Sequence, residues 1–144
     1  MSTFFIIDTN VVVAGLLTAH ADSPVARILD GMLSATFSFV VSESLLAEYH
    51  AVLVRPKLCK LHGLSVDEID AILADIARHA IVLAPACDQS MSPSAPDPGD
   101  QFLWNLLTTR ADLVLVTGDK LLLQDKAMQP RVIAPRTLVA QLTH

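Results

Sequence analysis

Short runs of apolar residues recur along the chain and predict its strands. The first run ends at Asp8, and the runs contain many β-branched, aliphatic and aromatic residues. Runs of this length that are apolar throughout, without alternation, are typical of parallel strands buried on both faces. The predicted strands span 4–7, 37–41, 81–83, 113–116 and 131–133.

Between these runs, apolar residues recur at the spacing of an amphipathic helix. Ser23 begins one helix, Ser42 caps a second that Pro56 ends, and Ser65 begins a third with a capping box. A fourth apolar stripe precedes the strand 113–116. The helical stripes fall in 25–32, 45–53, 69–76 and 102–107.

The alternation of predicted strands and helices indicates the fold class. Parallel strands need crossover connections, which are usually helices and cover both faces of the sheet. We therefore expect an α/β fold: a three-layer sandwich with a central, mainly parallel sheet of about five strands flanked by helices. The segment 88–99 is rich in Ser, Pro and Asp and predicts a surface loop, which is too short to divide the single domain expected over 1–144.

The composition is that of a chain that folds around its own core. Hydrophobic residues make up 52% of the 144 positions and charged residues 17%, which excludes an intrinsically disordered protein. The apolar runs are far shorter than the about 20 residues needed to cross a bilayer, so no membrane span is expected. Asp8 and Asn10 interrupt the first run, unlike in a secretory signal, and we expect a cytoplasmic protein.

The net charge of −5 argues against a protein that coats nucleic acid, because such proteins are usually basic. An acidic total also results when carboxylates are gathered to hold divalent cations. The two cysteines, Cys59 and Cys87, belong to no Cys-x-x-Cys or Cys/His cluster. We expect both thiols to be reduced and without a chemical role.

Acidic residues follow the predicted strands at the edge where α/β sheets bind ligands. Asp8 comes directly after the first strand, and Asp119 follows the strand 113–116 by three positions. Glu48 lies on the inward side of the helix that follows the second strand. Because an acid that faces inward needs a partner, we expect these side chains to share a site.

Two further acids, Asp97 and Asp100, stand at the start of the helix that leads into the strand 113–116. They compete for one role: we assign Asp100 to the site because it directly precedes the apolar stripe, and Asp97 to helix capping. Carboxylates brought together repel one another, and hard cations that prefer oxygen ligands relieve this repulsion. The sequence therefore predicts a Mg²⁺ or Mn²⁺ site made of Asp8, Glu48, Asp100 and Asp119.

Each of these residues also has a simpler interpretation. Asp8 and Asp119 are common turn residues, and Glu48 can be a solvated helix position. The basic residues after the Glu48 helix either form a solvated face or contact the phosphate backbone of a nucleic acid strand. These basic residues are Arg55, Lys57 and Lys60.

Five short segments occur in order along nearly the whole chain. They are 6–11 (IIDTNV), 42–48 (SESLLAE), 55–58 (RPKL), 97–103 (DPGDQFL) and 116–120 (VTGDK). Each segment alone is weak, but the five in this order, between matching strands and helices, are fairly specific. In them the chain resembles PIN-domain proteins of the kind that act as toxins in toxin–antitoxin systems, the VapC-like ribonucleases.

The resemblance implies a parallel sheet with an acidic pocket that holds one or two Mg²⁺ or Mn²⁺ ions and cleaves single-stranded RNA. It also implies a homodimer and an antitoxin partner that places an Arg or Lys among the acids. Relatives often carry an accessory acid where this chain has Leu121, which lowers the expected affinity for a second ion. The matching positions are Asp8, Glu48, Asp100 and Asp119 for the acids, Thr9 and Asn10 for the turn beside the first acid, and Thr117 for a supporting hydroxyl.

Two other functions compete with a metal-dependent endoribonuclease. An acid after the first strand also marks haloacid-dehalogenase phosphatases and receiver domains. Those proteins need a second acid two positions later or a pair of acids just before, where this chain has Asn10 and the pair Ile6 and Ile7. A catalytically silent PIN-fold binding module is the other alternative, and the four acids argue against it.

Overall fold

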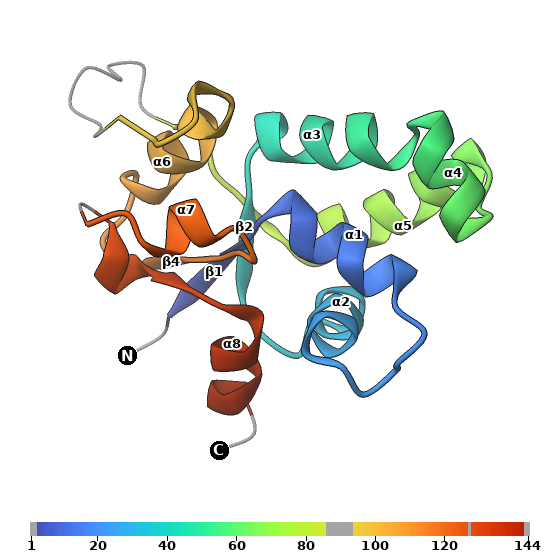
Figure 1. Cartoon of the computed structure of the whole chain (residues 1–144), viewed down its shortest axis with the longest axis horizontal. Coiled ribbons are helices and arrows are strands. Elements are labelled where there is room, and N and C mark those ends of the chain that lie inside the picture. The colour runs from blue at the N-terminus through green and yellow to red at the C-terminus, as the bar shows by residue number, and fades with distance from the viewer. Residues whose placement is uncertain (1–2, 86–93, 127, 143–144) are drawn as a thin grey trace.

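The computed structural model describes residues 3–85, 94–126 and 128–142 (Figure 1). Five strands form one sheet, in the order β3-β2-β1-β4-β5, and every neighbouring pair is parallel. This confirms the predicted α/β architecture. The strands are β1 (Phe4–Ile7), β2 (Phe39–Val41), β3 (Ile81–Val82), β4 (Leu113–Val116) and β5 (Val132–Ile133).

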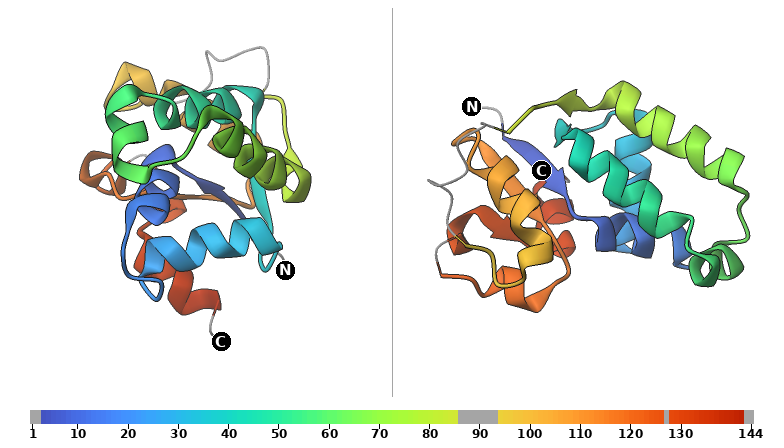
Figure 2. Two further views of the ribbon diagram at one scale, coloured as in Figure 1. Left: turned by 90° about the vertical axis from the view of Figure 1, so that its right-hand side faces the viewer. Right: turned by 90° about the horizontal axis from the view of Figure 1, so that it is seen from above.

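Helices flank the sheet on both sides. In Figure 1 and in the right-hand view of Figure 2, α1 to α5 lie on one side of the strands and α6 and α7 on the other. Among the described residues, no helix has the length and apolar character needed to cross a membrane. The helices are α1 (Thr9–Leu17), α2 (Pro24–Ser34), α3 (Glu43–Leu53), α4 (Pro56–His62), α5 (Val66–His79), α6 (Gln101–Leu107), α7 (Lys120–Leu123) and α8 (Pro135–Leu142).

Helix α1 is the largest element that the apolar pattern does not predict. Its residues are apolar on nearly all sides and include three consecutive valines, which are weak helix formers. The segment is helical because it packs against both α2 and α3 and because the Asp8 side chain caps its first turn. Gly15 permits the contact with α2, since a Cβ there would lie 2.6 Å from the Val25 carbonyl oxygen.

Other boundaries follow the predictions with small differences. The capping box of Ser65 and Glu68 is present at the start of α5. The strand expected from 37 begins at Phe39, and Pro56 both follows the end of α3 and opens the next helix, α4. Cys59 is a free thiol, as predicted, whereas Cys87 and most of the predicted loop 88–99 lie outside the described residues.

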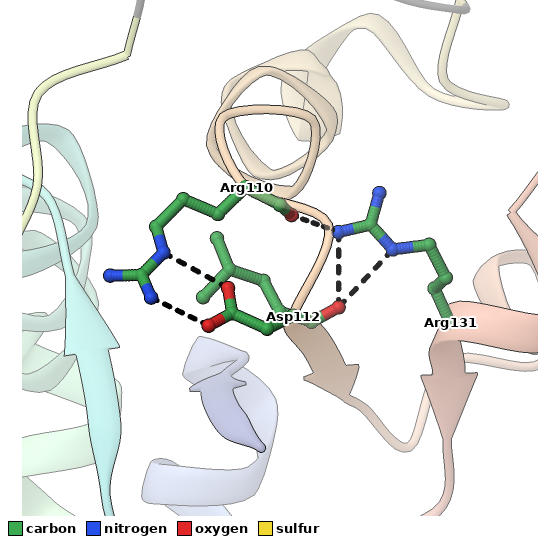
Figure 3. Close-up of polar contacts among 4 residues, drawn as sticks. Arg110, Asp112 and Arg131 are labelled. Atoms are coloured by element: carbon green, nitrogen blue, oxygen red, sulfur yellow. Dashed lines mark hydrogen bonds and ion pairs between the residues drawn. The ribbon is translucent and has the colours of Figure 1, made fainter. Parts of the chain in front are cut away.

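Arg131 connects the end of α6 and the beginning of β4 through hydrogen bonds. Its guanidinium donates hydrogen bonds to the carbonyl oxygens of Leu107 (2.6 Å), Leu113 (3.1 and 3.2 Å) and Arg110. Beside it, Arg110 forms a two-point ion pair with Asp112 (Figure 3). This network fixes the turn through which the chain enters β4.

Candidate active site

The topology places the ends of β1 and β4 side by side. These central strands are paired in register, with Ile7 opposite Val116, and the Asp8 amide donates to the Val116 carbonyl oxygen at 2.9 Å. In the sheet, β1 lies between β2 and β4, and the strand order reverses at β1: β2 and β3 follow on one side, and β4 and β5 on the other. The carboxyl edge at such a switch point is where open α/β sheets bind ligands.

Asp8 is held in a fixed orientation at this edge. The residue is only 7% exposed, and its Oδ1 accepts a hydrogen bond from the Thr9 amide at 2.7 Å. Its Oδ2 accepts from the Thr117 hydroxyl at 2.8 Å and from the Asn10 side-chain amide at 3.2 Å. Burial raises the pKa of Asp8, the hydrogen bonds from Thr117 and Thr9 oppose this rise, and the nearby Asp119 and Glu48 add to it.

Thr117 and Asn10 join the loops that follow β1 and β4. The fully buried Thr117 hydroxyl accepts from the Asp119 amide at 3.1 Å and from Asn10 at 3.3 Å, besides donating to Asp8. The Asn10 side-chain oxygen in turn accepts from the Gly118 amide at 3.2 Å. The two loops therefore form one hydrogen-bonded unit, and a displacement of either moves the Asp8 carboxylate.

Asp119 lies just beyond this unit, at the start of α7. Its side chain caps the helix by accepting from the Leu121 amide at 2.9 Å. It is partly exposed, and its charge raises the pKa of both Asp8 and Asp100. Leu121, the residue that stands in place of an accessory acid, is 63% exposed.

Glu48 lies on α3, and a hydrogen bond from a buried tyrosine of this helix connects α3 to β1. The neighbouring Tyr49 is fully buried, and its hydroxyl donates to the Ile7 carbonyl oxygen, one residue before Asp8. Burial, and next the charge of Asp8, raise the pKa of Tyr49 well above its usual value. The apolar pattern places Tyr49 only within the helical stripe 45–53, although a buried tyrosine needs a partner for its hydroxyl.

Asp97 and Asp100 have different roles in the structure. Asp97 is exposed and caps the 3-10 turn Pro98–Asp100 by accepting from the Gly99 amide at 2.9 Å, which is the capping role expected of it. Asp100 is half-buried. Burial, followed by the charges of Asp8, Asp97, Asp119 and Glu48, raises the pKa of Asp100 to about 6.

In addition to burial, the charges of neighbouring acids therefore raise the pKa of Asp8 and of Asp100, and none of the four predicted acids forms an ion pair with a described residue. The ion pairs among the described residues join His50 to Asp70, Arg78 to Asp75 and Arg110 to Asp112. Within the same described residues, no three His, Cys, Asp or Glu side chains are grouped closely enough to hold one metal ion. The acids share one edge of the sheet but do not converge on a point.

The predicted basic residues lie beyond α3. Arg55 is the exposed residue between α3 and α4, and it lines a groove with Glu48. Lys57 and Lys60 are exposed and lie three positions apart on α4, hence on one side of that helix. Only Arg55 thus borders the neighbourhood of the acids.

A parallel sheet with carboxylates collected at its switch point defines an α/β protein with an acidic candidate site. The chain belongs to the PIN domain family, whose model matches residues 5–121. PIN domains are generally nucleases and typically use divalent metal ions.

The solved structures support the same fold. The chain is similar to the crystal structure of PAE2754 from Pyrobaculum aerophilum, with a TM-score of 0.62 and 17% sequence identity over 98% of this chain and 90% of that one. At this identity the likeness establishes the fold alone. Among curated proteins, none matches the sequence.

Proposed function

We propose that this protein is a metal-dependent endoribonuclease that hydrolyses phosphodiester bonds of single-stranded RNA. Asp8, Glu48, Asp100 and Asp119 would hold Mg²⁺ or Mn²⁺. The observation that carries this proposal is the gathering of four acids at one edge of the sheet, none of which forms an ion pair with a described residue. Burial first, and then the charges of the neighbouring acids, raise the pKa of Asp100 to about 6.

The donor set suits a hard divalent ion, because all four side chains offer oxygen atoms. The absence of a converged group of three acids means that at least some of these side chains would change rotamer when they bind the ion. Asp8 is the exception, since three hydrogen bonds already fix its carboxylate. We therefore assign Asp8 as the fixed ligand, around which the more exposed acids arrange themselves.

When bound, a divalent ion lowers the pKa of its water and stabilises charge on the phosphate and the leaving oxygen. The protein's own contribution is to hold the acids. Thr117 and Asn10 orient Asp8, and Tyr49 keeps α3, and with it Glu48, against the end of β1. Arg55, Lys57 and Lys60 would contact the phosphate backbone of the strand without reading its sequence.

The proposed activity also suggests a biological role and a protein partner. We infer that the protein is the toxin of a toxin–antitoxin pair, as its sequence resemblance implies. The antitoxin would place an Arg or Lys among the four acids, where a cation takes the role of the metal's charge. Binding of the antitoxin segment and of Mg²⁺ would then weaken each other reciprocally.

Asp8→Asn tests the catalytic assignment, because it removes the charged ligand and keeps the shape of the side chain. We expect end-labelled single-stranded RNA to be cut by the wild type with Mg²⁺ or Mn²⁺ but not with EDTA, and the variant to lose this cleavage. Calorimetric titration with Mn²⁺ should show weaker binding to the variant, independently of activity.

The matched control is Asp67→Asn, at an exposed position in the first turn of α5. This variant should cut RNA and bind Mn²⁺ as the wild type does. Full activity of the Asp8→Asn protein would refute the assignment. RNA binding by the wild type without cleavage under any metal would indicate a catalytically silent binding module instead.

A further inference from the structure

A groove runs between α1 and α3 and ends beside the acids. Helix α1 lines it with residues four positions apart, and α3 continues the opposite wall toward Arg55 at the same kind of spacing. The volume of the groove is about 470 Å³. We call it the α1–α3 groove; its defining residues are Thr9, Val13, Leu17, Glu48, Val52 and Arg55.

The chemical character of the side chains that line the groove changes along its length. The apolar lining comes from Val13 and Leu17 on α1 and from Val52 on α3. Glu48 and Thr9 lie at the end next to Asp8, whereas the exposed Arg55 lies beyond α3, roughly 10 Å from Glu48 by the rise of a helix. A ligand that suits this groove has an apolar body and carries a negative charge at the end distant from the acids.

Thr9 adds a second, independent observation. The residue is 7% exposed, and its side-chain oxygen, buried in the protein, has no hydrogen-bond partner among the described residues. A buried hydroxyl without a partner costs about 1–3 kcal/mol. Threonine in a helix adopts two side-chain rotamers, so a change of rotamer at Thr9 can present this hydroxyl to the groove that the residue lines.

We propose that the α1–α3 groove is a subsite for one nucleoside of the RNA strand, next to the phosphate that is cut. This inference rests on the proposed ribonuclease function. The nucleoside lies against Val13, Leu17 and Val52, the Thr9 hydroxyl bonds to one of its polar groups, and Arg55 binds the following phosphate.

The size and position of the groove favour a nucleoside over a helical peptide. Its volume falls in the range of roughly 300–1,000 Å³ that is usual for small-ligand sites. Its inner end is continuous with the acids, since Thr9 adjoins Asp8 and Glu48 is itself one of the four. A strand with its phosphate at the acids must therefore place an adjoining nucleoside in or beside this groove.

The first test fills the groove. Ala14 lines it, and Ala14→Phe should weaken binding of a fluorescein-labelled short single-stranded RNA by at least about tenfold, because the ring takes the nucleoside's place. Binding is measured by fluorescence anisotropy in EDTA, where no cleavage occurs. Ala74→Phe, at an exposed position of α5, is the matched control and should bind RNA as the wild type does.

The second test is Thr9→Val, which keeps the shape of the side chain and remains informative if Ala14→Phe fails to fold. Because the free protein gives this hydroxyl no partner, the variant should be at least as stable as the wild type to urea. Its affinity for the same RNA should nevertheless fall about fivefold. A purely structural role of Thr9 would not lower affinity while stability is kept.

The outcomes separate this inference from the proposed function. If the wild type cuts RNA with Mg²⁺ but Thr9→Val and folded Ala14→Phe bind RNA unchanged, the nucleoside subsite is refuted and the ribonuclease stands. The same unchanged affinity is expected if an apolar peptide occupies the groove. If the wild type binds RNA and both variants weaken it without any cleavage, the subsite stands and the catalytic function fails. If the wild type cuts RNA with Mg²⁺ but binds none in EDTA, the subsite is refuted and the ribonuclease stands. If it neither cuts nor binds RNA, both are refuted.

Discussion

Thr117→Val is expected to destabilise the metal-free protein although it hardly changes the shape of the side chain. The Thr117 hydroxyl is fully buried and donates to the Asp8 carboxylate at 2.8 Å, while it accepts from the Asp119 amide and from Asn10. The substitution therefore leaves a buried carboxylate without its strongest side-chain donor. Asp119 and Asn10 are more exposed, and water can replace the bonds that they lose.

The magnitude follows from the bond to Asp8. A hydrogen bond to a charged group contributes about 1.5–3 kcal/mol and a neutral one about 0.5–1.5 kcal/mol. We expect the free energy of unfolding to fall by about 2–4 kcal/mol near neutral pH, mostly through Asp8. Thr117→Ser keeps the hydroxyl and removes one buried methyl group, so it should cost only about 1 kcal/mol.

The pH dependence has a defined sign. The Thr117 hydrogen bond lowers the pKa of Asp8, which means that it stabilises the ionised carboxylate. Its contribution is present when Asp8 is ionised and is lost as the pH falls through the Asp8 pKa. The stability difference between wild type and Thr117→Val should therefore shrink toward acidic pH.

Urea unfolding followed by circular dichroism, in EDTA at neutral and at acidic pH, measures these differences. The slope of the transition should be the same for all three proteins. An equal destabilisation of Thr117→Ser and Thr117→Val would refute the role of the hydroxyl, because the lost methyl group would then dominate. A stability difference that grows at acidic pH would also refute it.

Three further outcomes are expected. The pKa of Asp100 in the folded protein is about 6 instead of 3.8, so ionisation of Asp100 lowers the stability of the folded state. The urea midpoint of the metal-free wild type should therefore fall relative to that of Asp100→Asn as the pH rises through this interval. Parallel profiles of the two proteins would contradict this expectation. Arg131→Met should lower the free energy of unfolding by about 2–3 kcal/mol, because several carbonyl oxygens lose a charged donor. Arg136→Met, at an exposed position, is the control and should leave the free energy of unfolding nearly unchanged in the same urea assay. We also expect a homodimer, as the family resemblance implies, and a monomeric mass in light scattering at micromolar concentration would argue against it.

Much of this fold could be predicted from the sequence because its strands are short, uniformly apolar runs between capped helices. Asp8 was placed at the edge of the sheet from its position after the first run alone, since side chains beyond adjacent parallel strands must emerge together. The pairing of β1 with β4 brings Thr117 to Asp8, which agrees with the expectation that side chains beyond adjacent parallel strands lie together. These features depend on local pattern and on general rules of chain connection.

Other features depend on contacts between distant segments and leave little trace in the local pattern. Helix α1 has no polar face to reveal its period, because α2 and α3 cover it. The role of Tyr49 depends on a carbonyl oxygen in another element, which only the packing of α3 on β1 supplies. For the same reason, the groove beside Thr9 could not be foreseen from the residues that line it.

The pairing of β1 with β4 has a consequence for the synthesis of the chain. Asp8 and its hydrogen-bond donor Thr117 are separated by 109 positions, so the centre of the sheet closes only after the residues up to Thr117 have left the ribosome. Contacts of such long range are formed late, because the entropy of closing the intervening loop must first be overcome. A nascent or prematurely terminated chain that ends before Thr117 would therefore carry Asp8 without the hydroxyl of Thr117, and the acidic site would be assembled only once the residues up to Asp119 are present.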